Sequence, residues 1–259
     1  MPFGAFHRHG FARVGAATPR VALADPLENA RSTLQLARRA ADDGADLVVF
    51  PELGLSGYSI DDLHMQDGLL NAVEDAVAAV VEGTRDLSSV LLVGAPLRRK
   101  GRLYNCAVAI SRGRNLGVVP KSYLPNYREY YEKRWFAPGI GLAGLTVELA
   151  GQDVPFGPDL LFAATDLADF VFHVEICEDY WAPTPPSTAG ALAGANVLCN
   201  LSASNITVGK SAERHLLAAS QSMRCMAAYV YAAAGAGEST NDVAWDCLLY
   251  TSDAADEED

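Results

Sequence analysis

An apolar stripe near the start of the chain has the spacing of a single helix. Its members follow one another at steps of four, three and four residues: Ala30, Leu34, Ala37 and Ala41. Such steps place side chains on one face of a helix. The preceding Asp25-Pro26-Leu27-Glu28 has the form of a capping box with proline at the first helical position, and Gly44 suits the residue after the last turn. We predict a helix between Asp25 and Gly44, after a short strand at residues 11–18.

The residues after this helix predict a buried strand that ends at a carboxylate. Asp46-Leu47-Val48-Val49-Phe50-Pro51 is an apolar run closed by proline, which is typical of a strand buried on both faces. Its carboxyl end leads directly to Glu52. A glutamate in that place is most often a solvated loop residue or a helix cap. The functional alternative is a partly desolvated group that moves protons.

Further apolar runs extend the same pattern to the end of the chain. They predict strands at residues 90–94, 104–111, 116–119, 160–163, 170–176, 195–201 and 229–233, with helices at about 69–83 and 211–227. Helices and strands alternate at first, and hairpin-like strands follow in the middle. Mixed parallel and antiparallel strands with covering helices form an α/β layered fold. Half of the residues are hydrophobic, enough for a large core, and we expect one domain.

The charge balance excludes several classes of partner. The 259 residues carry a formal charge of -12, whereas nucleic acids and anionic membranes bind clustered Lys and Arg. No apolar run reaches the length of about eighteen residues that a membrane span needs. Residues 1–10 carry His7, Arg8 and His9 in place of a signal-peptide core. We expect a soluble, cytoplasmic protein with a small, near-neutral substrate and no nucleic-acid or membrane partner.

Cys177 stands apart from the other cysteines. The five cysteines are widely spread, with no CxxC pair and no Cys/His ligand spacing, so we expect neither a disulfide framework nor a metal site. Cys177 follows the predicted strand at 170–176 and has acidic neighbours that are costly to bury without a purpose, namely Glu175, Glu178 and Asp179. A strand-to-helix turn there would leave backbone amides to bind an oxyanion. The alternative is a buried structural thiol, our interpretation of Cys106, Cys199 and Cys225.

A reactive thiolate needs a neighbouring base or cation. Lys121 follows the predicted strand at 116–119; a lone lysine there is usually on the surface, but at a pocket mouth it would stabilise a thiolate or an oxyanion. Among the histidines, strand alternation puts His173 on the same face as Cys177. Residues four apart on a strand are too distant for a hydrogen bond. We therefore do not favour a Cys-His dyad.

Four segments carry a resemblance to a known family. They are Val49-Phe50-Pro51-Glu52-Leu53-Gly54-Leu55-Ser56-Gly57-Tyr58, Pro120-Lys121-Ser122-Tyr123-Leu124-Pro125-Asn126-Tyr127-Arg128-Glu129, Glu175-Ile176-Cys177-Glu178-Asp179 and Asn200-Leu201-Ser202-Ala203-Ser204-Asn205. With glutamate, lysine and cysteine in this order, the chain resembles the nitrilase (carbon-nitrogen hydrolase) superfamily. More narrowly, it is similar to the glutaminase domains of glutamine-dependent NAD synthetases, over about residues 10–246.

The resemblance implies a fold, a reaction and a set of site residues. The fold would be an αββα four-layer sandwich with mixed sheets. Cys177 would form a thioester with the side-chain amide of glutamine and release ammonia, with Glu52 as general base. Lys121 and the backbone amide of Glu178 would stabilise the oxyanion. The resemblance further assigns substrate-binding or pocket-lining roles to Tyr58, Tyr127, Glu132, Glu178, Ser204 and Lys210.

The resemblance also sets expectations about domains and partners. Residues 1–10 would be a tail and 11–246 a glutaminase domain incomplete at its C-terminus, while 247–259 depart from the family pattern and indicate an acidic, frayed tail. The expected partners are L-glutamine, a synthetase domain that amidates nicotinate adenine dinucleotide, and further copies of the full-length protein. The glutaminase step needs no cofactor, because ATP and Mg would belong to the synthetase domain, whose Ser-Gly-Gly-type loop is absent. The alternatives are a free-standing amidase or carbamoylase, and an inactive binding fragment.

Overall fold

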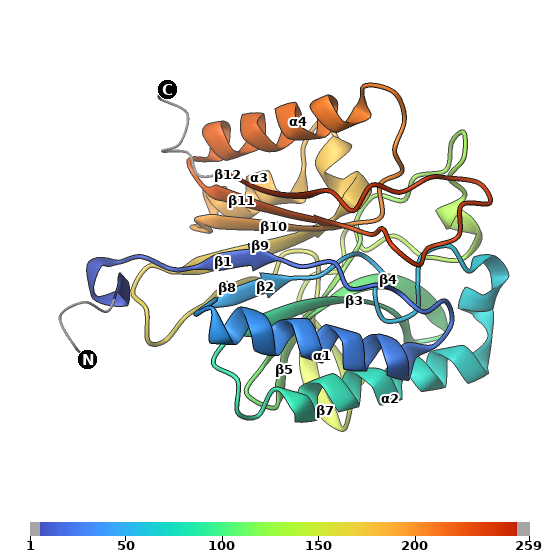
Figure 1. Ribbon diagram of the computed structural model, residues 1–259, viewed down its shortest axis with the longest axis horizontal. Coiled ribbons are helices and arrows are strands. Elements are labelled where there is room, and N and C mark those ends of the chain that lie inside the picture. Colours follow the sequence, from blue (N-terminus) through green and yellow to red (C-terminus); the bar gives the residue numbers. More distant parts are fainter. Residues whose placement is uncertain (1–5, 253–259) are drawn as a thin grey trace.

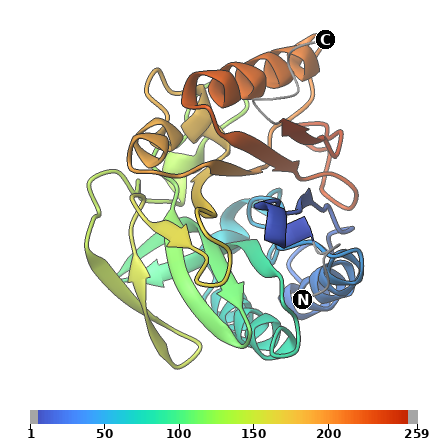
Figure 2. The ribbon, with the colours of Figure 1, turned by 90° about the vertical axis from the view of Figure 1, so that its left-hand side faces the viewer.

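The computed structural model describes residues 6–252, and their helices and strands lie in four layers (Figure 1). Helices α1 (Pro26–Asp42) and α2 (Asp67–Gly83) cover a seven-stranded sheet, and α3 (Pro186–Leu192) and α4 (Lys210–Cys225) cover a five-stranded one. The two sheets face each other between the helical layers (Figure 2). The α/β class with two mixed sheets is thereby confirmed.

The seven-stranded sheet has the order β1-β2-β3-β4-β5-β7-β6. Its strands are β1 (Val14–Ala16), β2 (Leu47–Val49), β3 (Val90–Arg99), β4 (Arg102–Ser111), β5 (Arg114–Pro120), β6 (Leu145–Leu149) and β7 (Gln152–Phe156). β1, β2 and β3 are mutually parallel, with α1 and α2 as their crossovers, while β3, β4 and β5 pair antiparallel. β7 lies parallel to β5 and forms a hairpin with β6.

The five-stranded sheet has the order β12-β11-β10-β9-β8. Its strands are β8 (Leu161–Ala163), β9 (Val171–Ile176), β10 (Val197–Ser202), β11 (Ala228–Ala233) and β12 (Leu249–Ser252). The three central strands are parallel, with α3 and α4 as crossovers, and the two edge strands pair antiparallel. Short 3-10 helices η1 (Phe6–His9), η2 (Asp61–Met65), η3 (Glu132–Arg134) and η4 (Cys177–Trp181) complete the fold.

Apolar side chains fill the space between the two sheets. Val49 and Leu92 from the larger sheet meet Phe172, Val174 and Ile176 from β9 in one buried cluster. Because alternate residues of a strand point to opposite faces, the residues between them on β9 point outward. The ring of His173 accordingly packs against α3, beside Gly190. Close packing of this interior holds the carboxyl ends of β2, β5 and β9 at fixed positions.

The predicted helices and the predicted strands are all present, and the first helix has the predicted ends. The Asp25 side chain accepts a hydrogen bond from the Glu28 amide at 3.2 Å, and Gly44 has a φ of +81°. The Glu28 carboxylate pairs with Arg31, so only one half of the capping box forms. Strands β6 and β7, and the short helix α3, are additions that the apolar runs did not predict.

The structure differs from the predictions at both ends and on β9. Residues 6–9 form η1, and residues 249–252 form β12 on the edge of the smaller sheet instead of a frayed tail. The rest of the two predicted tails, residues 1–5 and 253–259, lies outside the described residues. His173 and Cys177 do not share a strand face, because β9 ends at Ile176 and the backbone of Cys177 turns into a left-handed conformation.

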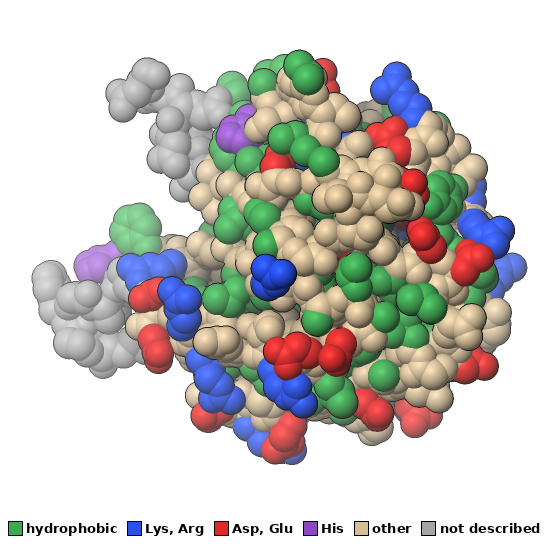
Figure 3. All heavy atoms as spheres, turned by 45° about the vertical axis from the view of Figure 1, so that its right-hand side comes forward, with side chains coloured by type: hydrophobic (Ala, Val, Ile, Leu, Met, Phe, Trp, Pro, Cys, Tyr) green, Lys and Arg blue, Asp and Glu red, His purple; other side chains and the backbone are tan. Residues whose placement is uncertain are grey.

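Basic and acidic side chains are interspersed over the face of the molecule in Figure 3. Within residues 6–252, no helix is long and apolar enough to cross a membrane.

Candidate active site

Three buried polar side chains meet where strands of both sheets end. Glu52 follows β2, Lys121 follows β5 and Cys177 follows β9. Glu52 and Lys121 are each 1% exposed and Cys177 is 6% exposed. Burying charged groups is costly unless they are paired. The site therefore depends on the contacts among these groups.

Lys121 lies between two buried carboxylates. Its Nζ donates to Glu52 Oε1 at 2.6 Å and to Glu132 Oε1, from η3, at 2.7 Å. Burial by itself lowers the pKa of Lys121, but Glu132 and Glu52 together raise it well above its usual value. The ammonium thus stays charged, and within residues 6–252 two of its three N–H bonds have carboxylate partners.

Glu52 is held at both oxygens. Oε1 also accepts from Asn105 Nδ2 of β4 at 2.6 Å, and Oε2 accepts from the backbone amide of Ala203 at 2.7 Å. These donors come from the larger sheet and from the segment after β10 in the smaller sheet. The carboxylate is thereby oriented by groups from both halves of the sandwich.

Glu132 is the second carboxylate of the cluster. Burial raises its pKa to about 7, because the charge of Glu52 adds to desolvation while Lys121 opposes both. Its Oε1 also accepts a hydrogen bond from the Tyr58 hydroxyl at 2.8 Å, and its Oε2 has no partner within the described structure.

Cys177 occupies a strained turn at the start of η4. Its φ is +43°, a left-handed conformation that costs a non-glycine residue about 1–3 kcal/mol. The side chain of Asn200, on β10, accepts a hydrogen bond from the Cys177 amide at 3.2 Å. Burial and the charge of Glu52 raise the thiol pKa to about 12, against the opposing effect of Lys121. The resting group is therefore a thiol and requires a base to react as a nucleophile.

Two of the predicted substrate residues lie together at the outer edge of the site. Tyr127 is 51% exposed, and its hydroxyl donates to Glu178 Oε1 at 2.9 Å. Glu178 is the residue after Cys177, so this pair adjoins the turn at Cys177. A partly buried carboxylate there can bind a cationic group of a ligand.

The other predicted substrate residues lie after β10. Ser204 is buried and follows Ala203, whose amide holds Glu52. Lys210 begins α4; its Nζ donates to Asn205 Oδ1 and lies 5.6 Å from the ring centroid of Tyr130. Burial lowers the pKa of Lys210. The predicted substrate residues Glu178, Ser204 and Lys210 thus lie in the segments that follow β9 and β10, whose carboxyl ends also carry Cys177 and the Ala203 amide.

Sequence reasoning missed several residues that support this arrangement. They are Asn105, Tyr130, Asn200 and Asn205, all buried or half-buried polar groups whose hydrogen bonds join the site's segments. Asn105 did carry a signal, since it is an isolated amide within the apolar strand β4. Such a group must find a hydrogen-bond partner when it is buried.

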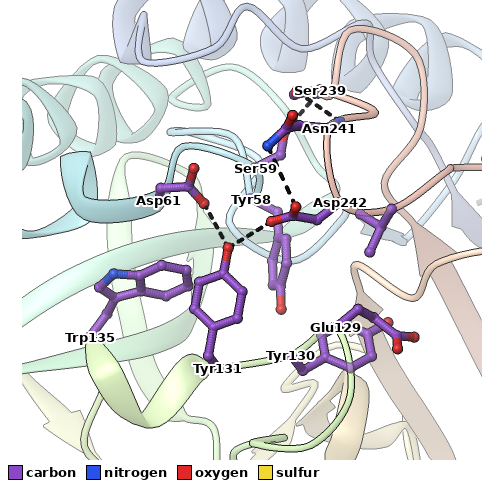
Figure 4. A pocket seen from close by; sticks show the side chains of 11 residues that line it. Tyr58, Ser59, Asp61, Glu129, Tyr130, Tyr131, Trp135, Ser239, Asn241 and Asp242 are labelled. Carbon is purple, nitrogen blue, oxygen red and sulfur yellow. Dashed lines mark hydrogen bonds between the residues drawn. The ribbon is translucent and has the colours of Figure 1, made fainter.

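A small cavity of about 50 Å³ adjoins the cluster through Tyr58 and Tyr130 (Figure 4). At its rim the Tyr131 hydroxyl bridges Asp61 Oδ1 at 3.1 Å and Asp242 Oδ2 at 2.8 Å. This bridge joins three segments that are far apart in the sequence. Tyr58 lines the same cavity and donates its hydroxyl to Glu132 Oε1 at 2.8 Å.

No metal site is found among residues 6–252, because no group of three or more His, Cys, Asp or Glu side chains is arranged to hold an ion. All five cysteines are free thiols.

Comparison with known sequences gives consistent matches along most of the chain. A family model described as carbon-nitrogen hydrolase matches residues 12–252. A glutamine-dependent NAD(+) synthetase of Mycobacterium tuberculosis is 61% identical over 246 residues, which are 95% of this chain and 36% of that relative. A protein of the same name from Mycobacterium leprae is 58% identical over the same shares. The chain therefore spans about a third of the length of these curated relatives.

Solved structures match the fold over a similar range. A glutamine-dependent NAD(+) synthetase from Cytophaga hutchinsonii superposes with a TM-score of 0.81 and 27% identity, covering 94% of this chain and 39% of that one. An amidase from Nesterenkonia sp. has a TM-score of 0.72 and 19% identity, covering 94% of this chain and 83% of that one. At that identity the second likeness concerns the fold alone.

Proposed function

Because this chain belongs to the carbon-nitrogen hydrolase family, we propose that it hydrolyses the side-chain amide of glutamine and releases ammonia through a thioester on Cys177. The observation that carries this proposal is the buried contact of Lys121 with Glu52 at 2.6 Å, beside a cysteine in a strained strand-end turn. It supplies a nucleophile, a base and a cation in one place, as amide hydrolysis requires.

The first half-reaction forms the thioester. Glu52 accepts the thiol proton as Cys177 Sγ bonds to the amide carbon, which becomes tetrahedral. Because the thiol pKa is high, the proton is transferred to Glu52 during the attack, and no thiolate is present beforehand. The carbon–nitrogen bond then breaks, and the same proton passes from Glu52 to the departing nitrogen, which leaves as ammonia.

Lys121 stabilises the oxyanion of that tetrahedral intermediate. Two of its N–H bonds are directed to Glu52 and Glu132, and the third is assigned to the substrate oxygen. The backbone amide of Glu178 is the second proposed donor, because it is the first amide after the nucleophile in η4. Losing one such donor typically costs a factor of about 10²–10³ in rate.

The second half-reaction returns the free thiol. Glu52 takes a proton from a water molecule, whose oxygen attacks the thioester carbon. The carbon–sulfur bond breaks, glutamate leaves, and Cys177 regains its proton from Glu52. The contacts of Glu52 support this step, because the Ala203 amide and the Asn105 side chain hold its carboxylate in one orientation.

The groups around Cys177 suit the two charges of glutamine's backbone end. Glu178, hydrogen-bonded by Tyr127, offers a carboxylate for the α-ammonium group. Lys210, at the start of α4, offers an ammonium for the α-carboxylate. Buried Ser204 lies between Glu178 and Lys210 in the sequence. Opposite charges on separate sides of a pocket fix the direction in which an amino acid binds.

We propose further that the ammonia serves NAD synthesis. The relatives at 61% and 58% identity are named glutamine-dependent NAD(+) synthetases. The synthetase step would belong to the part of those relatives that this chain does not match.

The test is ammonia release from glutamine, compared with aliphatic amides such as propionamide. We expect glutamine to be hydrolysed at least tenfold more efficiently, and the Cys177→Ala variant to be inactive while melting like the wild type. Equal rates with the two kinds of amide would favour a general amidase instead. Activity that survives in Cys177→Ala would refute the mechanism.

A further inference from the structure

The carboxylate of Asp179 bridges the two strand ends that carry Lys121 and Cys177. Its Oδ1 accepts from the amides of Ser122 at 3.0 Å and Tyr123 at 2.7 Å. Its Oδ2 accepts from the amide of Ile176 at 2.9 Å. One oxygen therefore binds the residues after Lys121, and the other binds the residue before Cys177.

The bridge crosses from one sheet to the other. Lys121 follows β5 of the seven-stranded sheet and Cys177 follows β9 of the five-stranded sheet. The sheets pack through side chains, and ladder hydrogen bonds join strands only within each sheet. Side-chain packing alone tolerates small sliding displacements, whereas hydrogen bonds fix direction as well as distance. Asp179 is 1% exposed, so water does not compete for these bonds.

Each strand end is also held from its own side. The Lys121 amide donates to the Asn105 carbonyl oxygen at 2.8 Å, and the Lys121 carbonyl accepts from Gly139 at 2.7 Å. The Cys177 amide donates to Asn200 on the neighbouring strand β10. These contacts fix each end within its sheet. The Asp179 carboxylate adds a direct backbone link between the two ends.

We propose that Asp179 is a positioning residue that sets the distance between the Lys121 ammonium and the Cys177 sulfur. It acts through the backbone of both strand ends and does not itself touch the substrate. This positioning role rests on the proposed function. The proposed function, in turn, does not require that Asp179 has this role.

The matched control is Glu175, an equally buried acid on β9. Its carboxylate accepts from the Ser187 amide at 2.9 Å and from the Tyr229 hydroxyl at 2.6 Å, both on the outer side of the smaller sheet. The Asp179→Asn and Glu175→Gln variants make the same chemical change, because an amide nitrogen cannot accept from a backbone N–H. Only the first breaks a link between the sheets.

We expect Asp179→Asn to lower kcat for glutamine by about 10–100-fold with a smaller change in KM, since a displacement of about 1 Å costs this much. Glu175→Gln should keep a kcat within about threefold of the wild type, although its melting temperature should fall by about as much as that of Asp179→Asn. An unchanged kcat in Asp179→Asn, or equal losses in both variants, would overturn the proposal. If Asp179→Asn does not fold, Asp179→Glu keeps the carboxyl group and moves it by one methylene. Full kcat in that variant would equally overturn the proposal.

A substrate-independent measurement separates this proposal from the proposed function. Iodoacetamide alkylation of Cys177 can be followed by peptide mass mapping, with exposed Cys247 as the internal reference. If the wild-type chain releases no ammonia from glutamine, the proposed function fails and this comparison decides the role of Asp179. We expect at least about fivefold slower alkylation of Cys177 in Asp179→Asn than in Glu175→Gln, because Lys121 no longer favours the thiolate. Equal rates would refute the positioning role.

Discussion

At the scale of single residues, the site is a balance of buried charges around Lys121. One ammonium faces two carboxylates, Glu52 and Glu132, at 2.6 and 2.7 Å. Removing one partner of a buried pair leaves an uncompensated charge, which is strongly destabilising. The acidic excess is relieved when Glu132 binds a proton, as its raised pKa indicates.

The protonation of Glu132 predicts a pH dependence of stability. Its folded-state pKa of about 7 lies above the ordinary value of 4.5. Between these values the folded chain holds a proton that the unfolded chain has released. Its contribution to the free energy of unfolding is thus fully present below pH 4.5 and is lost as pH rises to about 7.

Chemical denaturation of the wild type and of Glu132→Gln across this range measures that contribution. The wild-type free energy of unfolding should decline more steeply with rising pH than that of the variant, and the two curves should run parallel above pH 7 to 8. Identical slopes throughout the range would show that Glu132 does not titrate there.

At the scale of elements, Gly94 on β3 leaves room for the turn that carries Glu52. A Cβ at Gly94 would lie 2.5 Å from the Pro51 carbonyl oxygen and would also collide with the Leu53 amide nitrogen. The Leu55 amide donates to the Gly94 carbonyl at 3.0 Å, so the turn cannot simply move away. The close approach of this strand and this turn therefore requires glycine.

We predict that Gly94→Ala displaces Glu52. Ammonia release should fall at least about tenfold, and the free energy of unfolding should fall by about 1–3 kcal/mol, as overpacking typically costs. The control is Gly15→Ala on β1, where an added Cβ meets no atom within 4 Å. Wild-type activity in Gly94→Ala would mean that the turn adapts without moving the carboxylate.

Much of the element order was predictable because buried elements have strong patterns. The stripe from Ala30 to Ala41 predicted α1, and continuous apolar runs predicted β2 and β9. The β6–β7 hairpin was missed because the prediction followed continuous apolar runs; the alternation of apolar and polar residues in Leu145–Leu149 was itself a strand signal. Helix α3 is only seven residues long, and glycine and proline obscure its pattern.

At the scale of the whole molecule, convergence of the site could not be deduced from local patterns. Glu52 and Lys121 come from one sheet and Cys177 from the other, so their approach depends on how two sheets pack. Periodicity predicts which face of a strand is buried, but it does not predict which strand ends lie close together. Only the resemblance of four segments brought the three residues into one predicted site. The supporting side-chain amides, such as those of Asn105 and Asn200, lie within strands whose other residues are mostly apolar, so the hydrophobic pattern does not mark them.

The four-layer fold thus places one cysteine, the proposed nucleophile, in surroundings that differ from those of the other thiols. Cys106 and Cys199 are buried within strands, and Cys225 and Cys247 lie outside the charged cluster. Cys177 alone among the cysteines in the described chain follows a strand end beside Glu52 and Lys121. A reagent that binds as glutamine does should distinguish it from the other four.

The most direct test of the account is labelling by a glutamine analogue whose amide is replaced by a diazoketone, followed by peptide mass mapping. We predict one adduct, on Cys177, which forms more slowly when glutamine is present. In the Glu52→Gln variant this adduct should form more slowly than in the wild type. An unlabelled Cys177 in folded protein, or labelling that glutamine does not slow, would contradict the claim that this cysteine attacks the amide of glutamine.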